Sequence, residues 1–213
     1  MNESSNPSAP PMLQSVARYY TDRLERFGAT AAGVDWNSTD SQRLRFSQLL
    51  RFGPESGEQS VNDYGCGYGA LADYLREIGH DWHYRGFDIS ESMIASARSL
   101  HNADPRCGFT NDAGSLTPAD YTLASGIFNV TLGWDPVAWR DYVIDTLATL
   151  NRLTVKAFAF NMLSTYSDVE RRRSDLFYGD PLFFLDLCKR RFSSRVGLLH
   201  DYPLHEFTVI VRK

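Results

Sequence analysis

The chain has 213 residues, of which 43% are hydrophobic and 23% are charged, a length and composition typical of one globular domain with a sizeable core. A formal net charge of -4 at pH 7 argues against a broad nucleic-acid-binding surface, and no apolar run approaches the roughly 18 residues of a membrane span. The three cysteines, Cys66, Cys107 and Cys188, are far apart in the sequence, which predicts neither a disulfide nor a metal site and favours a reducing, cytoplasmic location.

The N-terminal part of the sequence predicts a short tail followed by two helices. Residues 1–12 are rich in Ser, Asn and Pro, so we expect a disordered tail there. Apolar residues recur every three or four positions across 13–27, which is typical of one face of a helix, and Gly28 follows as a stop. A second helix with capping residues at its front is predicted in 38–52. We therefore expect 13–55 to form an N-terminal helical cap.

From residue 56 onward, short apolar runs alternate with helical stretches, which is the pattern of a parallel sheet covered by helices. Strands are predicted near 60–64, 83–88, 106–110, 120–126 and 155–161, and helices near 69–79, 91–101 and 137–151. After a further helix in 179–192, two β-rich runs in 193–213 predict an antiparallel hairpin. The predicted fold class for 56–213 is therefore α/β: a doubly wound, seven-stranded, mostly parallel sheet with a C-terminal antiparallel strand pair.

Three closely spaced glycines, Gly65, Gly67 and Gly69, lie in the stretch VNDYGCGYGALADYL between the first predicted strand and a helix. Glycines in such a turn let the backbone approach a ligand, and the helix N-terminus points toward that ligand. The same stretch satisfies GxGxxG/A, with Asp88 at the end of the next strand, so an NAD-dependent oxidoreductase is one interpretation. Asp63 argues against it, because a carboxylate two residues before the first glycine would repel a pyrophosphate but suits a cationic or amine-bearing ligand.

Four stretches, taken in order, resemble the motifs of the class I S-adenosylmethionine-dependent methyltransferases. VNDYGCGYG resembles the first motif, GFDIS the second, TNDAGS the loop after the third strand, and ADYTLASGIFNV the fourth strand. The final stretch LLHDYPLHEFTVIVRK is similar to the antiparallel strand pair that ends the family fold. The resemblance implies S-adenosylmethionine as the cofactor, bound by a methyltransferase domain over 56–213.

The resemblance also implies which residues contact the cofactor. Asp63 and the glycines would form the pocket for its methionine part, Asp88 would accept hydrogen bonds from the ribose hydroxyls, and Asp112 would accept from the adenine amino group. The full predicted set is Asp63, Gly65, Gly67, Gly69, Asp88, Ile89, Met93, Asn111, Asp112, Ala113, Ser125, Gly126 and Ile127. Purely structural roles stay open for some of them: a helix cap at Asp88, a core position for Met93, and a turn at Asp112.

The acceptor side carries no motif. The stretch GIFNVT after the fourth strand lacks the Asn/Asp-Pro-Pro-aromatic signature of family members that methylate nucleobases or glutamine. Candidate acceptor-binding residues come from the cap, from this stretch and from the long polar segment after the fifth strand: Tyr20, Trp36, Arg43, Asn129, Asn161, Tyr166, Arg171 and Tyr178. His200, Tyr202 and His205 are weak candidates for a catalytic base, by residue type alone, since histidines beside a hairpin turn are more often surface residues.

The predicted function is methyl transfer from S-adenosylmethionine to a nitrogen or oxygen of a small molecule, with the helical cap as a lid. The alternatives are the NAD-dependent oxidoreductase and a non-catalytic, methyltransferase-like binding subunit. The expected partner is a small-molecule methyl acceptor; no metal, no membrane and no nucleic acid is expected, and a homo-oligomer is left open.

Overall fold

The computed structural model describes residues 10–53 and 57–213. Its seven strands form one sheet in the order β3-β2-β1-β4-β5-β7-β6. The strands are β1 (Ser60–Tyr64), β2 (His83–Phe87), β3 (Cys107–Thr110), β4 (Ala119–Ala124), β5 (Thr154–Leu163), β6 (Val196–Leu199) and β7 (Glu206–Arg212). The first five pair in parallel, and β7 runs antiparallel to both β5 and β6. The predicted fold class is therefore confirmed.

The helices begin and end where their capping residues stand. They are α1 (Pro11–Phe27), α2 (Thr39–Leu49), α3 (Ala70–Glu77), α4 (Glu91–Leu100), α5 (Pro136–Arg152) and α6 (Pro181–Arg191), with short 3-10 turns η1 (Ala31–Val34), η2 (Ala113–Ser115) and η3 (Val169–Arg171). Helix α2 starts with a reciprocal capping box between Ser38 and Ser41. Asp135 and Asp180 each cap a helix whose first residue is proline.

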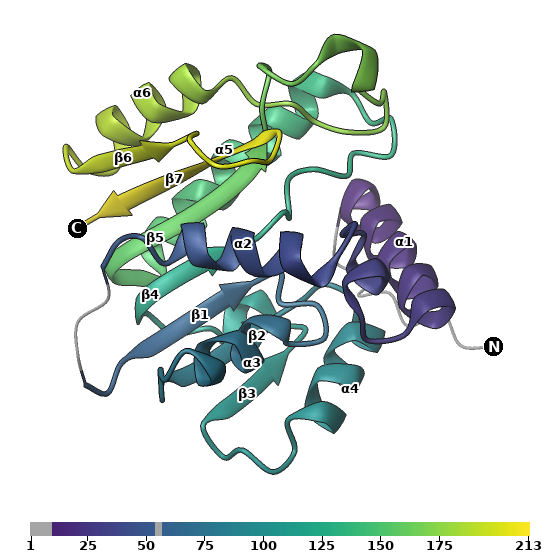
Figure 1. Cartoon of the computed structure of the whole chain (residues 1–213), viewed down its shortest axis with the longest axis vertical. Helices are drawn as coiled ribbons and strands as arrows, with labels where there is room; N and C mark the ends of the chain where they lie inside the picture. Colours follow the sequence, from purple (N-terminus) through teal and green to yellow (C-terminus); the bar gives the residue numbers. More distant parts are fainter. Residues whose placement is uncertain (1–9, 54–56) are drawn as a thin grey trace.

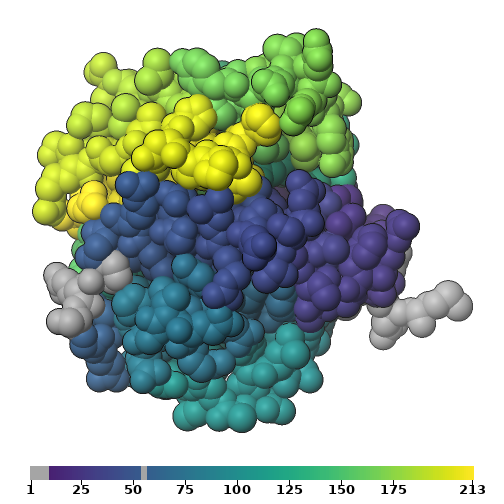
Figure 2. All heavy atoms as spheres, in the orientation of Figure 1, coloured from purple at the N-terminus to yellow at the C-terminus, as the bar shows by residue number. Residues whose placement is uncertain are grey.

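The N-terminal segment crosses one face of the sheet and reaches the edge where the parallel strands end. Figure 1 shows α2 lying across the sheet and α1 beside α4, at the edge toward which β1 points. Figure 2 shows the same segment as a blue-to-purple band between the C-terminal half and the glycine-turn half of the molecule. Helix α1 begins at Pro11, inside the predicted tail, while residues 1–9 of that tail lie outside the described residues.

Two apolar layers hold the sheet, one on each face. On one face, Phe46 and Leu49 of α2 and Leu71 of α3 pack with Val61 and Leu123. On the other, α5 and α6 pack with β4, β5 and β7 around the fully buried Trp139, whose Nε1 donates to the Phe128 carbonyl at 2.9 Å. Among the described helices, none combines the length and apolar character needed to cross a lipid bilayer.

Candidate active site

A cavity opens at the carboxyl edge of β1, β2 and β4, under the N-terminal segment. About 980 Å³ of space free of atoms lies within it, including the open solvent at its mouth. Most of the predicted cofactor residues line it: Asp63, Gly65, Gly67, Asp88, Ile89, Met93, Ser125, Gly126 and Ile127. The three strand ends thus bring residues that are far apart in the sequence to one wall of one cavity.

Asp88 ties the glycine turn to the end of β2. One carboxylate oxygen accepts from the Gly67 N–H and the other from the Ser90 N–H, each at 2.9 Å. Burial raises the pKa of Asp88, and the two N–H donors lower it in part. An ionised carboxylate has about four acceptor positions, so about two remain for a pair of ligand hydroxyls. The N-cap of α4 is Ser90, whose hydroxyl accepts from the Met93 N–H, so Asp88 is not the helix cap and keeps acceptor positions for a ligand in the cavity that it lines.

Asp63 is a buried carboxyl group with a single donor. The side chain is 3% exposed, and the Tyr84 hydroxyl donates to its Oδ2 at 2.5 Å. Burial raises the pKa of Asp63 to about 7; the Tyr84 hydrogen bond opposes this shift, and the nearby Asp88 adds to it. A cationic group in the cavity would lower this pKa again, so Asp63 suits an ammonium-bearing ligand.

The third wall of the cavity contains an unpaired polar atom. Ser125 Oγ is buried and has no hydrogen-bond partner within the described residues. Next to it, the Gly126 N–H donates to Asn161 Oδ1 at 2.7 Å, which fixes the chain where it leaves β4. Buried polar atoms normally have partners, so an orphaned hydroxyl at a cavity wall indicates a ligand position. Together with the two carboxylates, this wall fits S-adenosylmethionine, whose ribose and amino groups are hydrogen-bond donors.

Gly69 does not line the cavity. Its φ is +90°, and a Cβ there would lie 2.7 Å from His101 Nε2, so this glycine is required by the helix start and by packing. Asn111, Asp112 and Ala113 do not line the cavity either. Asp112 is exposed, and its side chain caps η2 by accepting from the Gly114 N–H at 2.9 Å. The structure thus shows that Asp112 shapes this turn, and its contact with the adenine stays a prediction.

The cap closes the cavity through further residues, of which Gln42 and Phe46 belong to the aromatic and polar side chains that the cap sequence offers for the site. Val16, Val34, Gln42 and Phe46 line it from α1, η1 and α2. The Tyr68 hydroxyl donates to Gln42 Oε1 at 3.4 Å, and the Thr21 and Ser90 hydroxyls lie 2.9 Å apart. The apolar spacing of the helices predicted a buried face but not which ligand that face would cover.

Two of the predicted acceptor residues, Tyr20 and Trp36, line this cavity and a second one next to it. The Trp36 ring lies against Gly126: a Cβ on that glycine would lie 2.2 Å from the Trp36 ring edge. The Arg45 guanidinium stacks on the same ring, 3.9 Å from its centroid. Trp36 therefore lines both spaces at the end of β4, and its role in binding the acceptor stays a prediction.

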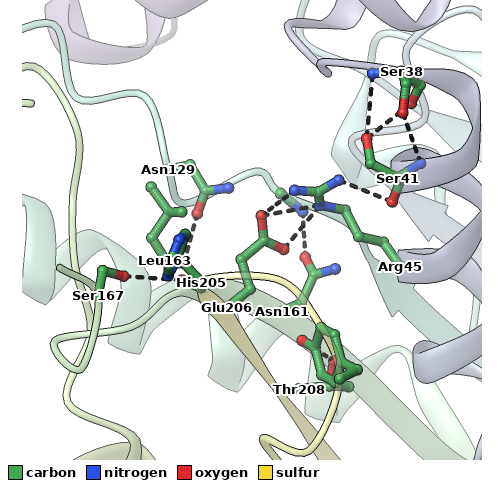
Figure 3. A network of polar contacts seen from close by, with 12 residues as sticks. Ser38, Ser41, Arg45, Asn129, Asn161, Leu163, Ser167, His205, Glu206 and Thr208 are labelled. Atoms are coloured by element: carbon green, nitrogen blue, oxygen red, sulfur yellow. Dashed lines mark hydrogen bonds and ion pairs between the residues drawn. The ribbon is translucent and has the colours of Figure 1, made fainter. Parts of the chain in front are cut away.

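The second cavity includes Asn129 but few other predicted acceptor residues. Asn129 is buried, and its Oδ1 accepts from the Leu163 N–H at 3.1 Å (Figure 3). Asn161 is fully buried beneath Gly126, and its amide nitrogen has no partner within the described residues. Asn161 therefore positions the chain at Gly126 rather than lining either cavity.

Besides Asn161, four predicted acceptor residues lie outside both cavities. Arg43 pairs with Glu77 and stacks on Tyr74. Tyr166 is 66% exposed, Arg171 pairs with Asp168 at the surface, and the Tyr178 hydroxyl accepts from the Arg173 N–H at 3.0 Å. The long polar segment after β5 is thus mostly held by its own contacts.

The three weak candidates for a catalytic base line neither cavity. His200 is exposed and packs against Tyr166, and the exposed His205 contributes its backbone carbonyl to Ser164. The Tyr202 hydroxyl lies 3.0 Å from Thr208 Oγ1, and burial raises the pKa of Tyr202. The structure keeps all three within the β6–β7 hairpin and its contacts, so residue type alone was a poor guide here.

Known proteins with similar sequences and folds are methyltransferases. A family profile described as a methyltransferase domain matches residues 61–153. The chain is 46% identical over 154 residues to the putative methyltransferase Rv1506c of Mycobacterium tuberculosis, an alignment that covers 72% of this chain and 93% of that protein.

Solved structures agree on the fold. Magnesium protoporphyrin IX methyltransferase of Synechocystis PCC 6803 with bound S-adenosylmethionine is 16% identical, with a TM-score of 0.65 over 98% of this chain and all of that one. The 1,6-didemethyltoxoflavin-N1-methyltransferase of Burkholderia thailandensis is 19% identical, with a TM-score of 0.60 over 97% of this chain and 92% of that one. The dinucleotide interpretation of the glycine turn gives way to these findings, and the chain belongs to the class I S-adenosylmethionine-dependent methyltransferases.

Proposed function

We propose that this methyltransferase modifies a nitrogen or oxygen of a small molecule that binds under the N-terminal cap. The observation that carries this proposal is the cover over the cofactor cavity: helices α1 and α2 and turn η1 lie over the strand ends, and Tyr20 and Trp36 line both the cofactor cavity and a second cavity beside it. Such a cover suits an acceptor small enough to be enclosed. The toxoflavin-precursor methyltransferase among the fold neighbours acts on a small molecule, which supports the same class.

In methyl transfer, some residues of this chain would bind the cofactor and others would exclude water from it. The cofactor supplies an already activated methyl group, so the protein mainly has to align the acceptor and exclude water. Asp88 would hold the ribose hydroxyls through its free acceptor positions. Asp63 would receive the amino group, and its ionisation would follow the arrival of that cation. Val34 and Phe46 would exclude water from above.

The N-terminal segment would act as a lid. It is tied to the cofactor side by two contacts between polar side chains, Thr21 with Ser90 and Tyr68 with Gln42. Helix α2 is also held by its apolar packing on the sheet and by the buried Arg45–Glu206 pair, so the part that moves would be α1 with η1, where the Thr21–Ser90 contact breaks. Because lids of this kind complete the site after the substrate binds, the acceptor would enter before this contact forms.

Calorimetric titration followed by a turnover screen tests the proposed function. We expect S-adenosylmethionine and S-adenosylhomocysteine to bind and NAD not to bind. The saturated enzyme would then be screened for S-adenosylhomocysteine release with small nitrogen and oxygen nucleophiles, and with a protein and an RNA mixture as controls. Release with the mixtures and with none of the small molecules would contradict the small-molecule assignment while leaving the cofactor intact.

A further inference from the structure

Two cavities meet at Trp36. The second cavity shares four lining residues with the cofactor cavity, Tyr20, Val34, Trp36 and Gly126. Because Gly126 begins the chain segment beside the orphaned Ser125 hydroxyl, the shared wall lies at the end of β4, where the cofactor wall ends. A molecule in the second cavity would therefore lie beside the cofactor, where Tyr20 and Trp36 line both spaces.

Every charged group that lines the second cavity already has a partner. Arg45 and Glu206 are both buried, and Arg45 Nε lies 2.9 Å from each Glu206 oxygen (Figure 3). The remaining lining charge is Asp35, which accepts from the Tyr19 hydroxyl at 2.8 Å and pairs with Arg23 at 3.1 Å. With Arg23 included, two carboxylates face two guanidinium groups, so no charge in this wall is left over for a ligand.

Asn129 offers the uncommitted hydrogen-bonding group of this cavity. It is 5% exposed, and its Oδ1 is held by the Leu163 N–H. Its amide nitrogen has no partner within the described part of the chain, and Figure 3 shows it turned away from Leu163. This nitrogen is not one of the fully buried polar atoms without a partner, so it is reachable from the cavity and can donate to a ligand atom with a lone pair. This observation is independent of the charge pairing.

We propose that the second cavity holds the methyl acceptor, and that this acceptor is an uncharged small molecule with an oxygen or nitrogen lone pair directed at Asn129. The assignment rests on the proposed function, because it gives the acceptor a place and a class. A charged acceptor loses its hydration on entering this space and meets no unpaired opposite charge, so the wall selects against carboxylates, phosphate esters and protonated amines. Tyr20 and Trp36 line both cavities, so they border the place where the acceptor atom must meet the methyl group, and they act as specificity-determining residues.

Binding of matched probes to the protein saturated with S-adenosylhomocysteine tests this assignment. The probes are benzyl alcohol beside benzyl phosphate, and benzamide beside benzoate, followed by ligand-observed NMR. We expect the neutral member of each pair to bind at least tenfold more tightly than the charged one. Tighter binding of the charged members, or binding of no probe at all, would overturn the assignment.

Two variants and one control locate the binding. Asn129→Asp keeps an oxygen for the Leu163 N–H but replaces the free donor by a charge, and we expect at least a tenfold loss of neutral-probe affinity. Asn102→Asp adds the same charge at an exposed turn and should change nothing. Leu176→Trp fills the cavity from the segment that pairs with Val130 and should give the same loss if Asn129→Asp folds poorly.

The affinity of each variant for S-adenosylhomocysteine distinguishes a failure of the proposed function from a failure of the second-cavity assignment. Asn129 lines the second cavity and not the first, so both variants should bind S-adenosylhomocysteine as the unaltered protein does. If the unaltered protein does not bind S-adenosylhomocysteine, the proposed function itself is contradicted. Normal cofactor binding, with probe binding that ignores Asn129→Asp and Leu176→Trp, would overturn the assignment of the second cavity alone.

Discussion

The two cavities that Trp36 lines are built in different ways. The wall of the cofactor cavity comes from three adjacent strand ends, and backbone N–H groups of Gly67 and Ser90 fix its carboxylate. The second cavity gathers residues from η1, α2, the loop after β4, and β5 and β7, and one buried ion pair, Arg45 with Glu206, joins two of these segments across the sheet. The cofactor cavity is thus organised by hydrogen bonds at the ends of neighbouring strands. The second cavity is organised by side-chain pairing between segments that are far apart in the sequence.

The largest change in the free energy of unfolding is expected at the buried ion pair, which joins the segments of the second cavity. Arg45→Met leaves Glu206 buried without a counter-charge and also removes the guanidinium from the Trp36 ring. Breaking a buried pair from one side costs about 3–5 kcal/mol, so we expect the free energy of unfolding to fall by about that amount. Urea denaturation monitored by circular dichroism measures it.

An exposed pair provides the matched control for that experiment. Arg171 and Asp168 form an ion pair in which both side chains are more than half exposed. Arg171→Met should therefore change the free energy of unfolding by less than about 0.5 kcal/mol. Equal losses in the two variants would mean that the Arg45–Glu206 pair does not hold the second cavity together.

The cofactor side is expected to respond mainly in affinity. Asp88→Asn keeps the shape of the side chain but removes the charge that strengthens its hydrogen bonds, including those to the ribose. A loss of about 3 kcal/mol corresponds to roughly 100-fold weaker S-adenosylmethionine binding by calorimetry. Asp112→Asn serves as the control, because Asp112 is exposed and outside the cavity; a loss as large as that of Asp88→Asn would restore its predicted adenine contact.

The same contrast explains how much the sequence could reveal. The strands, the fold class and most of the cofactor wall were predicted, because strand-end motifs keep functional residues next to the element that positions them. The second cavity carries no such signal, since the pairing of Arg45 with Glu206 joins positions 161 residues apart. Arg171 and Tyr178 line neither cavity and are held by neighbours within their own segment, and Tyr166 packs against His200 of the C-terminal hairpin, so their role in acceptor binding stays a prediction.

Alanine substitutions at two glycines in the loop after β4 test whether the Trp36 ring is held in place. Gly126 and Gly133 both have positive φ, +71° and +80°, so alanine strains the backbone at each. At Gly126 the new methyl also meets the Trp36 ring, whereas around Gly133 there is open space. We expect Gly126→Ala to lower the free energy of unfolding by about 2 kcal/mol more than Gly133→Ala in urea titrations. Equal losses would mean that the Trp36 ring moves aside freely and is not held in place.

The smallest effect concerns the proton on Asp63. In the free protein its pKa is raised to about 7 by burial, so below that pH the group is mostly neutral. A bound cation favours the ionised form and lowers the pKa, which means that binding below pH 7 must also remove a proton. The affinity for S-adenosylmethionine should therefore rise with pH through about 7 and then level off. We expect binding at pH 5.5 to be about tenfold weaker than at pH 7.5. Asp63→Asn cannot titrate and should flatten the profile, which also separates this effect from the titration of the ligand; an unchanged slope in the variant would place the cation away from Asp63.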